Sequence, residues 1–209
     1  MLPSGPIQTN GYLLLDAGRG EAVLVDAPGG ILERVTPLLA TAGARLTELW
    51  LTHGHWDHMQ EGARVKRETG ARVRAHRADQ PLIETPEIME GFMAQRLGLE
   101  GVPVDNWLEP GEELAALGRT FEVRHVPGHC PGNVLFHCAA AGVAFVGDAL
   151  FAGGVGRWDL PGGDFDTLAR SIREQIYTLP GETIVFPGHG PRTTVAAEQA
   201  GNPYVAAAG

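Results

Sequence analysis

Five histidines and two aspartates lie where short apolar segments end, and both residue types bind metal ions. The densest group is HGHWDH at residues 53–58, which directly follows the apolar segment ELWLT. Further along the chain, His129 follows FEVRHVPG, Asp148 follows VAFVG and His189 follows TIVFPG. A strand that ends in such a residue leaves the side chain at the rim of its sheet. Four strand ends that deliver imidazoles and carboxylates to one rim predict a metal site.

The spacing within HGHWDH favours a site for two ions. His53 and His55 occupy alternate positions, which places both imidazoles on one side of an extended segment. A turn into a helix at Asp57 would bring Asp57 and His58 toward a neighbouring point. One short segment can therefore serve two cations about 3.5–4 Å apart, the spacing of two-metal hydrolases.

The residue types indicate zinc, iron or manganese, because neutral imidazole and carboxylate suit these metals. The ligand groups contain no cysteine, which argues against a closed structural zinc site. Seven ligands for two divalent ions leave room for water, and a water between two cations becomes a hydroxide nucleophile near neutral pH. We therefore expect metal-assisted hydrolysis. A histidine-rich loop without a catalytic role is the alternative, and the three further strand-end ligands count against it.

The composition is that of a globular protein with an acidic surface. The 209 residues carry 16 Lys plus Arg against 25 Asp plus Glu, a net charge of −9. This charge argues against nucleic-acid binding, which needs a basic surface. Two cysteines give no disulfide framework, and no signal peptide or membrane-length apolar run is visible. We expect a cytoplasmic protein that does not bind membranes and forms a single domain over residues 1–209.

The periodicity predicts an α/β fold. Apolar residues at helical spacing predict helices over 31–42 and 165–176, the second capped by Asp164 or Asp166. Shorter helices are expected at 57–69, 87–97 and 193–201. Early hairpin-like strands followed by alternating helices and strands, in an order that then repeats, suggest two sheets packed face to face with helices outside. The expected strands are 12–16, 21–26, 47–52, 71–75, 120–126, 134–139, 143–147 and 183–186.

With these motifs in order, the chain resembles the metallo-β-lactamase superfamily, and within it the small glyoxalase II-like hydrolases. The motifs that carry the resemblance are HGHWDH, PGHCPGN, VGDALF, GRWDLPGGD and FPGHGP, and they span nearly the whole chain. The resemblance implies a four-layer αββα sandwich with the site at one edge of its two sheets. It also implies an acyl thioester as substrate, with a thiol as leaving group.

The resemblance further implies how the seven ligands divide between two metals. Asp148 would bridge both metals, and Asp57 would also orient the attacking hydroxide. Gly147 would permit a close backbone approach beside Asp148. The remaining ligands divide into His53, His55 and His129 for one metal and Asp57, His58 and His189 for the other.

Two features depart from the family pattern. Cys130 stands where many members have threonine, and we expect an inert thiol there. Only about twenty residues follow His189, whereas full-length glyoxalase II continues into a helical domain that helps to bind glutathione. Glutathione recognition is therefore expected to be weaker, different or absent.

Several residues near these motifs have two interpretations. Arg157 would bind a substrate carboxylate through its guanidinium or hold Asp159 or Asp164. Trp158 would line the substrate pocket or be buried. Asp26 would support a ligating imidazole or form a turn. Met89, Phe92, Met93 and Leu97 would form a flap or ordinary helix packing, and His76, His125 and His137 are expected to be structural or surface histidines.

Three other functions compete with thioester hydrolysis. Persulfide dioxygenases share the fold and motifs but use one iron, held by the equivalents of His53, His129 and Asp148. A lactone or other ester hydrolase would differ only in the shape of its pocket. A non-catalytic module would use the metals for stability alone, and the intact ligand set counts against it.

Overall fold

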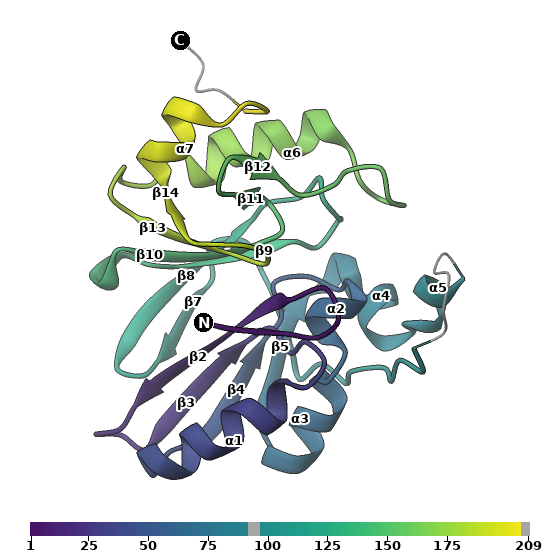
Figure 1. The fold of residues 1–209 in the computed structure, drawn as a ribbon, viewed down its shortest axis with the longest axis vertical. Coiled ribbons are helices and arrows are strands. Elements are labelled where there is room, and N and C mark those ends of the chain that lie inside the picture. The colour runs from purple at the N-terminus through teal and green to yellow at the C-terminus, as the bar shows by residue number, and fades with distance from the viewer. Residues whose placement is uncertain (92–96, 206–209) are drawn as a thin grey trace. The chain divides into compact units, whose positions relative to one another are not determined.

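The computed structural model describes residues 1–91 and 97–205, and it divides into two compact units, Met1–Leu108 and Glu109–Gly209. Each unit contains a six-stranded mixed sheet with helices packed on it (Figure 1). Each unit also has a hydrophobic cluster of its own. The α/β class is therefore confirmed, and the assignment of the whole chain to a single domain stays a prediction.

The sheet of the first unit begins antiparallel and continues parallel. Its first three strands form antiparallel pairs, and β3, β4, β5 and β6 then pair in parallel. Parallel neighbours end at the same edge of a sheet, so the segments that leave β3 and β4 start side by side. The strands in order across the sheet are β1 (Leu2–Ser4), β2 (Thr9–Asp16), β3 (Glu21–Val25), β4 (Arg45–Trp50), β5 (Arg72–His76) and β6 (Asn106–Leu108).

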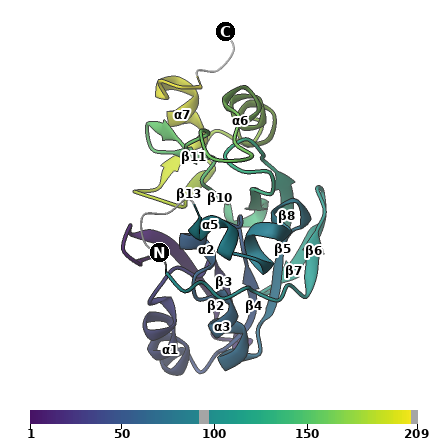
Figure 2. The same cartoon turned by 90° about the vertical axis from the view of Figure 1, so that its right-hand side faces the viewer.

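Helices α1 (Ile31–Ala42) and α3 (Gly62–Thr69) lie next to strands β2 to β4 in both views (Figures 1 and 2). Ile31, Val35 and Leu39 of α1 are buried on one helix face, as the predicted 3.6-residue period requires. Alternate residues of β3, Ala22 and Leu24, belong to the same cluster. Each fully buried aliphatic side chain contributes about 1.5–3 kcal/mol relative to an exposed one, so this face holds α1 on the sheet.

The helix predicted over 57–69 is broken into α2 (Trp56–Met59) and α3. Glu61 interrupts it, because its backbone N–H donates to the carbonyl of Ala27 and its carboxylate accepts from the N–H of Leu32. Both partners lie about thirty residues earlier in the chain, so no local pattern could have shown the break. The unit continues with a 3₁₀ turn (Arg77–Asp79), α4 (Gln80–Glu84) and α5 (Glu87–Glu90). Phe92 and Met93 of the predicted flap lie outside the described residues.

The sheet of the second unit is antiparallel except where β10 and β13 pair in parallel. A separate hairpin, β11 (Leu150–Phe151) and β12 (Gly154–Val155), follows β10 directly. The strands in order across the sheet are β14 (Thr193–Thr194), β13 (Ile184–Pro187), β10 (Val143–Gly147), β9 (Val134–Cys138), β8 (Arg119–His125) and β7 (Glu113–Ala116).

Helices α6 (Phe165–Ser171) and α7 (Val195–Gly201) belong to the second unit (Figure 1). Asp164 caps α6 by accepting a hydrogen bond from the N–H of Thr167, so one of the two proposed caps is confirmed. The predicted helix 165–176 continues beyond α6 as a π-helical turn, Ile172–Ile176. A separate 3₁₀ turn, Ala139–Ala141, lies earlier in the unit, after β9. The apolar face of helix 165–176 belongs to one hydrophobic cluster with four residues of the sheet, Leu135, Ala144, Val146 and Val185.

In residues 1–91 and 97–205, no helix combines the length and the hydropathy that a membrane span requires.

Candidate metal centre

The segment 53–58 leaves β4 in an extended conformation and turns into a helix, as its spacing predicts. His55 is extended, with φ −68° and ψ 145°, and the N–H of His58 donates to its carbonyl oxygen at the start of α2. The His53 ring centroid lies 4.9 Å from that of His55 and 4.1 Å from that of His58. Nε2 of His58 lies 3.3 Å from Oδ2 of Asp57. The first unit therefore brings its four predicted ligands together.

Asp26 orients the ring of His58. It directly follows β3, and its Oδ2 lies 2.8 Å from Nδ1 of His58. A carboxylate in this position accepts a hydrogen bond from Nδ1–H, which leaves Nε2 as the nitrogen available to a metal. Asp26 also has φ 59°, a left-handed conformation that is uncommon for any residue except glycine. Of the two interpretations of Asp26, the structure supports a partner for the imidazole of His58, a predicted ligand.

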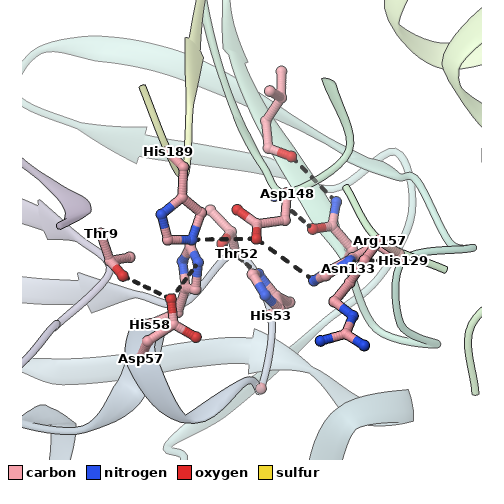
Figure 3. Close-up of polar contacts among 12 residues, drawn as sticks. Thr9, Thr52, His53, Asp57, His58, His129, Asn133, Asp148, Arg157 and His189 are labelled. Atoms are coloured by element: carbon pink, nitrogen blue, oxygen red, sulfur yellow. Dashed lines mark hydrogen bonds and ion pairs between the residues drawn. The ribbon is translucent and has the colours of Figure 1, made fainter. Parts of the chain in front are cut away.

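Thr52 links Asp26 to a second imidazole. Its N–H donates to Oδ1 of Asp26 at 2.7 Å, and its hydroxyl donates to Oδ2 at 2.8 Å. The same hydroxyl oxygen lies 3.0 Å from Nδ1 of His53 and accepts from it (Figure 3). Nε2 is then the nitrogen of His53 that is available to a metal as well. Sequence reasoning missed Thr52, although its place directly before HGHWDH was a usable signal.

Thr9, at the start of β2, is a second residue that sequence reasoning missed. Its hydroxyl donates to Oδ2 of Asp57 at 2.6 Å (Figure 3). The two residues are 48 positions apart in the chain, and nothing in the local sequence connects them. The bond fixes the orientation of the Asp57 carboxylate.

The three predicted ligands of the second unit converge on one carboxylate oxygen. Oδ2 of Asp148 lies 3.7 Å from Nε2 of His129 and 3.4 Å from Nε2 of His189 (Figure 3). Asp148 follows β10 and His189 follows β13, and these strands are parallel neighbours that end at one edge. The pairing of β10 with β13 therefore explains why residues 41 positions apart meet.

Two close backbone contacts hold His129 beside Asp148. Nδ1 of His129 donates to the carbonyl oxygen of Arg157 at 2.7 Å, which again leaves Nε2 available to a metal. Gly156 passes so near that a Cβ atom there would lie 1.8 Å from the Asp148 carbonyl oxygen and 3.0 Å from Nδ1 of His129. Gly147 has φ 57°, a conformation that glycine adopts without strain.

Asn133 supports Asp148 from the adjacent loop and was also missed. Its Oδ1 accepts from the N–H of Asp148 at 3.3 Å, and its Nδ2 donates to the carbonyl of Val146 at 3.2 Å (Figure 3). Asn133 is the last residue of the motif PGHCPGN, so the motif contains both a predicted ligand and the residue that positions another.

Arg157 and Trp158 lie in the loop that follows the β11–β12 hairpin. The Arg157 guanidinium forms a two-bond ion pair with the carboxylate of Asp159, at 2.8 and 2.9 Å. This pair raises the pKa of Arg157 and lowers that of Asp159. Trp158 is 37% exposed, and its ring centroid lies 4.8 Å from that of Phe165. A role of either residue in substrate binding stays a prediction.

The histidines outside the ligand motifs have local partners. Nδ1 of His76 accepts from the N–H of Ala78, and Nε2 of His125 donates to the carbonyl of Pro131 at 2.7 Å. His137 lies on β9 beside Glu122, and burial lowers the pKa of its ring. Cys130 is buried.

The donor set fits divalent metal ions. Imidazole nitrogens and carboxylate oxygens are the ligands that zinc, iron and manganese accept. In His53, His58 and His129, a neighbouring oxygen occupies Nδ1, the outer-layer contact that metal-binding histidines usually make.

Comparisons with known proteins agree with this chemistry. The sequence model of the Metallo-beta-lactamase superfamily matches residues 4–189. A relative from Haemophilus influenzae, named hydroxyacylglutathione hydrolase GloC, is 36% identical over 98% of this chain and 96% of its own length. A solved structure described as BLEG-1 B3 metallo-beta-lactamase has a TM-score of 0.90 and 36% identity, covering 98% of this chain and 97% of its own. TTHA1623, solved in a di-iron-bound form, has a TM-score of 0.85 and 38% identity, covering 98% of each chain. The predicted metallo-β-lactamase fold is confirmed.

Proposed function

The chain belongs to the metallo-β-lactamase superfamily of metal-dependent hydrolases, and from this premise we propose that it hydrolyses acyl thioesters with two bound divalent cations. The name of the Haemophilus influenzae relative, hydroxyacylglutathione hydrolase, supports a thioester as the substrate class. The observation that carries the proposal is the shared orientation of three histidines, each held at Nδ1 by a neighbouring oxygen.

We propose that the metals are zinc, iron or manganese and that the seven predicted ligands hold two of them. Asp148 would be the ligand shared by both metals, and its Oδ2 lies near the Nε2 atoms of two histidines. The two ligand sets are His53, His55 and His129 for one metal and Asp57, His58 and His189 for the other.

Bound cations of this kind supply Lewis acidity and lower the pKa of a water molecule toward about 7. The protein's own contribution begins at Asp57, whose Oδ2 accepts the Thr9 hydroxyl proton at 2.6 Å. A carboxylate fixed in this way accepts a proton from the nucleophile and returns it to the leaving thiolate. Asp26 and Thr52 keep two imidazoles in the tautomer that offers Nε2.

Arg157 and Trp158 are the proposed substrate-binding residues. Both belong to the loop after β12, in which the backbone carbonyl of residue 157 accepts from His129, so the loop contacts a proposed metal ligand. The guanidinium offers two parallel donors to a carboxylate, as its pairing with Asp159 demonstrates. An exposed indole beside it offers an apolar surface to an acyl group.

The test is a hydrolysis screen with protein whose metal content has been measured. Hydroxyacyl-glutathione and other acyl thioesters serve as substrates, and Asp57→Ala is compared with Asp16→Ala at the end of β2. We expect thioester hydrolysis by the wild type, a loss of about a hundredfold or more in Asp57→Ala, and no loss in the control. Wild-type protein with two metals per chain and no activity on any thioester contradicts the proposal.

The same preparation distinguishes the competing functions. Oxygen consumption with glutathione persulfide and one iron per chain would identify a dioxygenase. Turnover of lactones alone would identify an ester hydrolase. A β-lactam is included because one similar structure is described as a B3 metallo-beta-lactamase. A folded Asp57→Ala variant with unchanged activity would favour a non-catalytic role for the metals.

A further inference from the structure

Glu198 of α7 is a buried carboxylate outside the predicted ligand set. It is 4% exposed, and its Oε1 accepts from the Thr193 hydroxyl at 2.6 Å. Its Oε2 accepts from the N–H of Gly153 at 3.0 Å and from Nδ2 of Asn202 at 2.8 Å. Within the described residues, the three hydrogen-bond partners of this carboxylate are neutral donors: one backbone N–H and two side chains. Burying a charge is costly unless hydrogen bonds satisfy it, and these bonds hold the carboxylate rigidly.

The three donors come from three separate segments. Gly153 lies at the tip of the β11–β12 hairpin, and Thr193 begins β14, four residues after His189. Asn202 follows α7, and its Nδ2 also donates to the carbonyl of Gly154 at 3.0 Å. Glu198 thus ties the tip of the hairpin to the segment that follows His189.

The same hairpin and the residues on either side of it adjoin the three predicted ligands of the second unit. The hairpin starts at Leu150, two residues after Asp148, and its return strand ends two residues before Arg157, whose carbonyl accepts from His129. The ring of Phe151 in β11 meets the ring of His189 edge-on, with 6.0 Å between centroids. A shift of the hairpin would therefore move the contacts of His129, Asp148 and His189 together.

We propose that Glu198 is a positioning residue of the metal centre, which fixes the β11–β12 hairpin and through it the orientation of the three ligands of the second unit. The proposal rests on the metal-dependent function proposed above. Glu198 acts through the position of the hairpin, because the Glu198 carboxylate accepts its hydrogen bonds from the hairpin tip, from β14 and from Asn202.

The test compares Glu198→Gln with two control variants. The amide retains the shape of the side chain but has one acceptor oxygen, so at least one of the three donors loses its partner. Thr194→Ala removes the cap that accepts from the N–H of Ala197 and so weakens α7 without touching the partners of Glu198. Glu182→Gln removes an exposed charge of the same unit.

Two measurements are made on each protein. Zinc affinity is measured by competition with a chelator, and amide hydrogen exchange at Gly153 and Gly156 is measured in metal-free protein. We expect Glu198→Gln to bind zinc about tenfold more weakly, the lower end of the effect of outer-layer partners, and to exchange both amides faster. Thr194→Ala and Glu182→Gln should retain wild-type affinity and wild-type exchange at both glycines.

Wild-type zinc affinity and wild-type exchange in Glu198→Gln would overturn the proposal, as would equal losses in Thr194→Ala. If Glu198→Gln does not fold, Thr193→Val removes only the hydrogen bond to Oε1. That variant should also bind zinc more weakly and exchange both glycine amides faster, by smaller amounts. Unchanged values in that variant overturn the proposal too. Wild-type protein that binds no zinc, iron or manganese would instead refute the proposed function, and with it any role of Glu198 in a metal centre.

Discussion

Oδ2 of Asp26 lies 2.8 Å from Nδ1 of His58, and the same carboxylate accepts two hydrogen bonds from Thr52. Two predicted metal ligands thus depend on the Asp26 side chain: His58 directly, and His53 through Thr52. Asp26 itself has a left-handed backbone conformation directly after β3. Asp26 and His58 are 32 positions apart, and the fold brings them together.

Replacement of Asp26 by Asn should weaken metal binding without unfolding the first unit. The amide has a similar shape, but it cannot offer acceptors to the His58 ring and to both Thr52 donors at once. We expect metal affinity to fall by about 10- to 100-fold, measured by chelator competition. Asp16→Asn, at the end of β2, serves as the control. If Asp26→Asn binds metal as tightly as the wild type, Asp26 serves only to form the turn.

Gly156→Ala should disrupt the ligands of the second unit. The added Cβ would collide with the carbonyl oxygen of Asp148 and press on Nδ1 of His129. We expect metal affinity to fall more than about tenfold, together with hydrolytic activity. Gly154→Ala in the same hairpin is a matched control, because its Cβ would meet only Phe151 at ordinary contact distances of 3.8–4.0 Å. Equal effects of both substitutions would contradict this explanation.

Asp159→Asn should reveal whether Arg157 binds substrate. The substitution removes the carboxylate that holds the guanidinium, which then becomes available to a carboxylate on the substrate. We expect KM for thioesters bearing a carboxylate to fall about 2- to 5-fold, the scale of an exposed ion pair, with no change for uncharged acyl groups. Arg157→Ala should raise KM for the carboxylate-bearing substrates alone. A similar change in KM for both substrate classes would show that the Arg157–Asp159 ion pair only stabilises the loop.

His137 should make the second unit less stable in acid. Burial lowers the pKa of its ring from 6.5, and this effect exceeds that of Glu122, whose hydrogen bond raises it. Above pH 6.5 the ring is neutral in both the folded and the unfolded chain. As the pH falls through 6.5 the unfolded chain takes up the proton first, so the free energy of unfolding decreases.

The measurement is urea unfolding between about pH 5 and 8, the range in which histidine titrates. Wild-type protein should lose stability more steeply below pH 6.5 than His137→Gln, which has no titrating ring there. The proposed metal-binding histidines are present in both proteins, so their contribution cancels in the difference. Identical slopes would show that the His137 ring is protonated without cost.

Local sequence determined much of this protein. Apolar residues at helical spacing predicted α1 with its observed bounds, because one buried helix face needs only a 3.6-residue period. The strand before each predicted ligand was visible for the same kind of reason, since a short apolar segment is a local pattern. The types of the ligands, and the metals that they suit, also follow from the residues themselves.

Only the tertiary structure decided which residues support those ligands. Thr9 reaches Asp57 across 48 positions, and Asn133 supports Asp148 across 15. Glu61 breaks a predicted helix through contacts to the loop after β3 and to α1. Hydrogen bonds of this kind depend on which strands become neighbours, and strand order is set by the packing of a whole sheet rather than by any short segment.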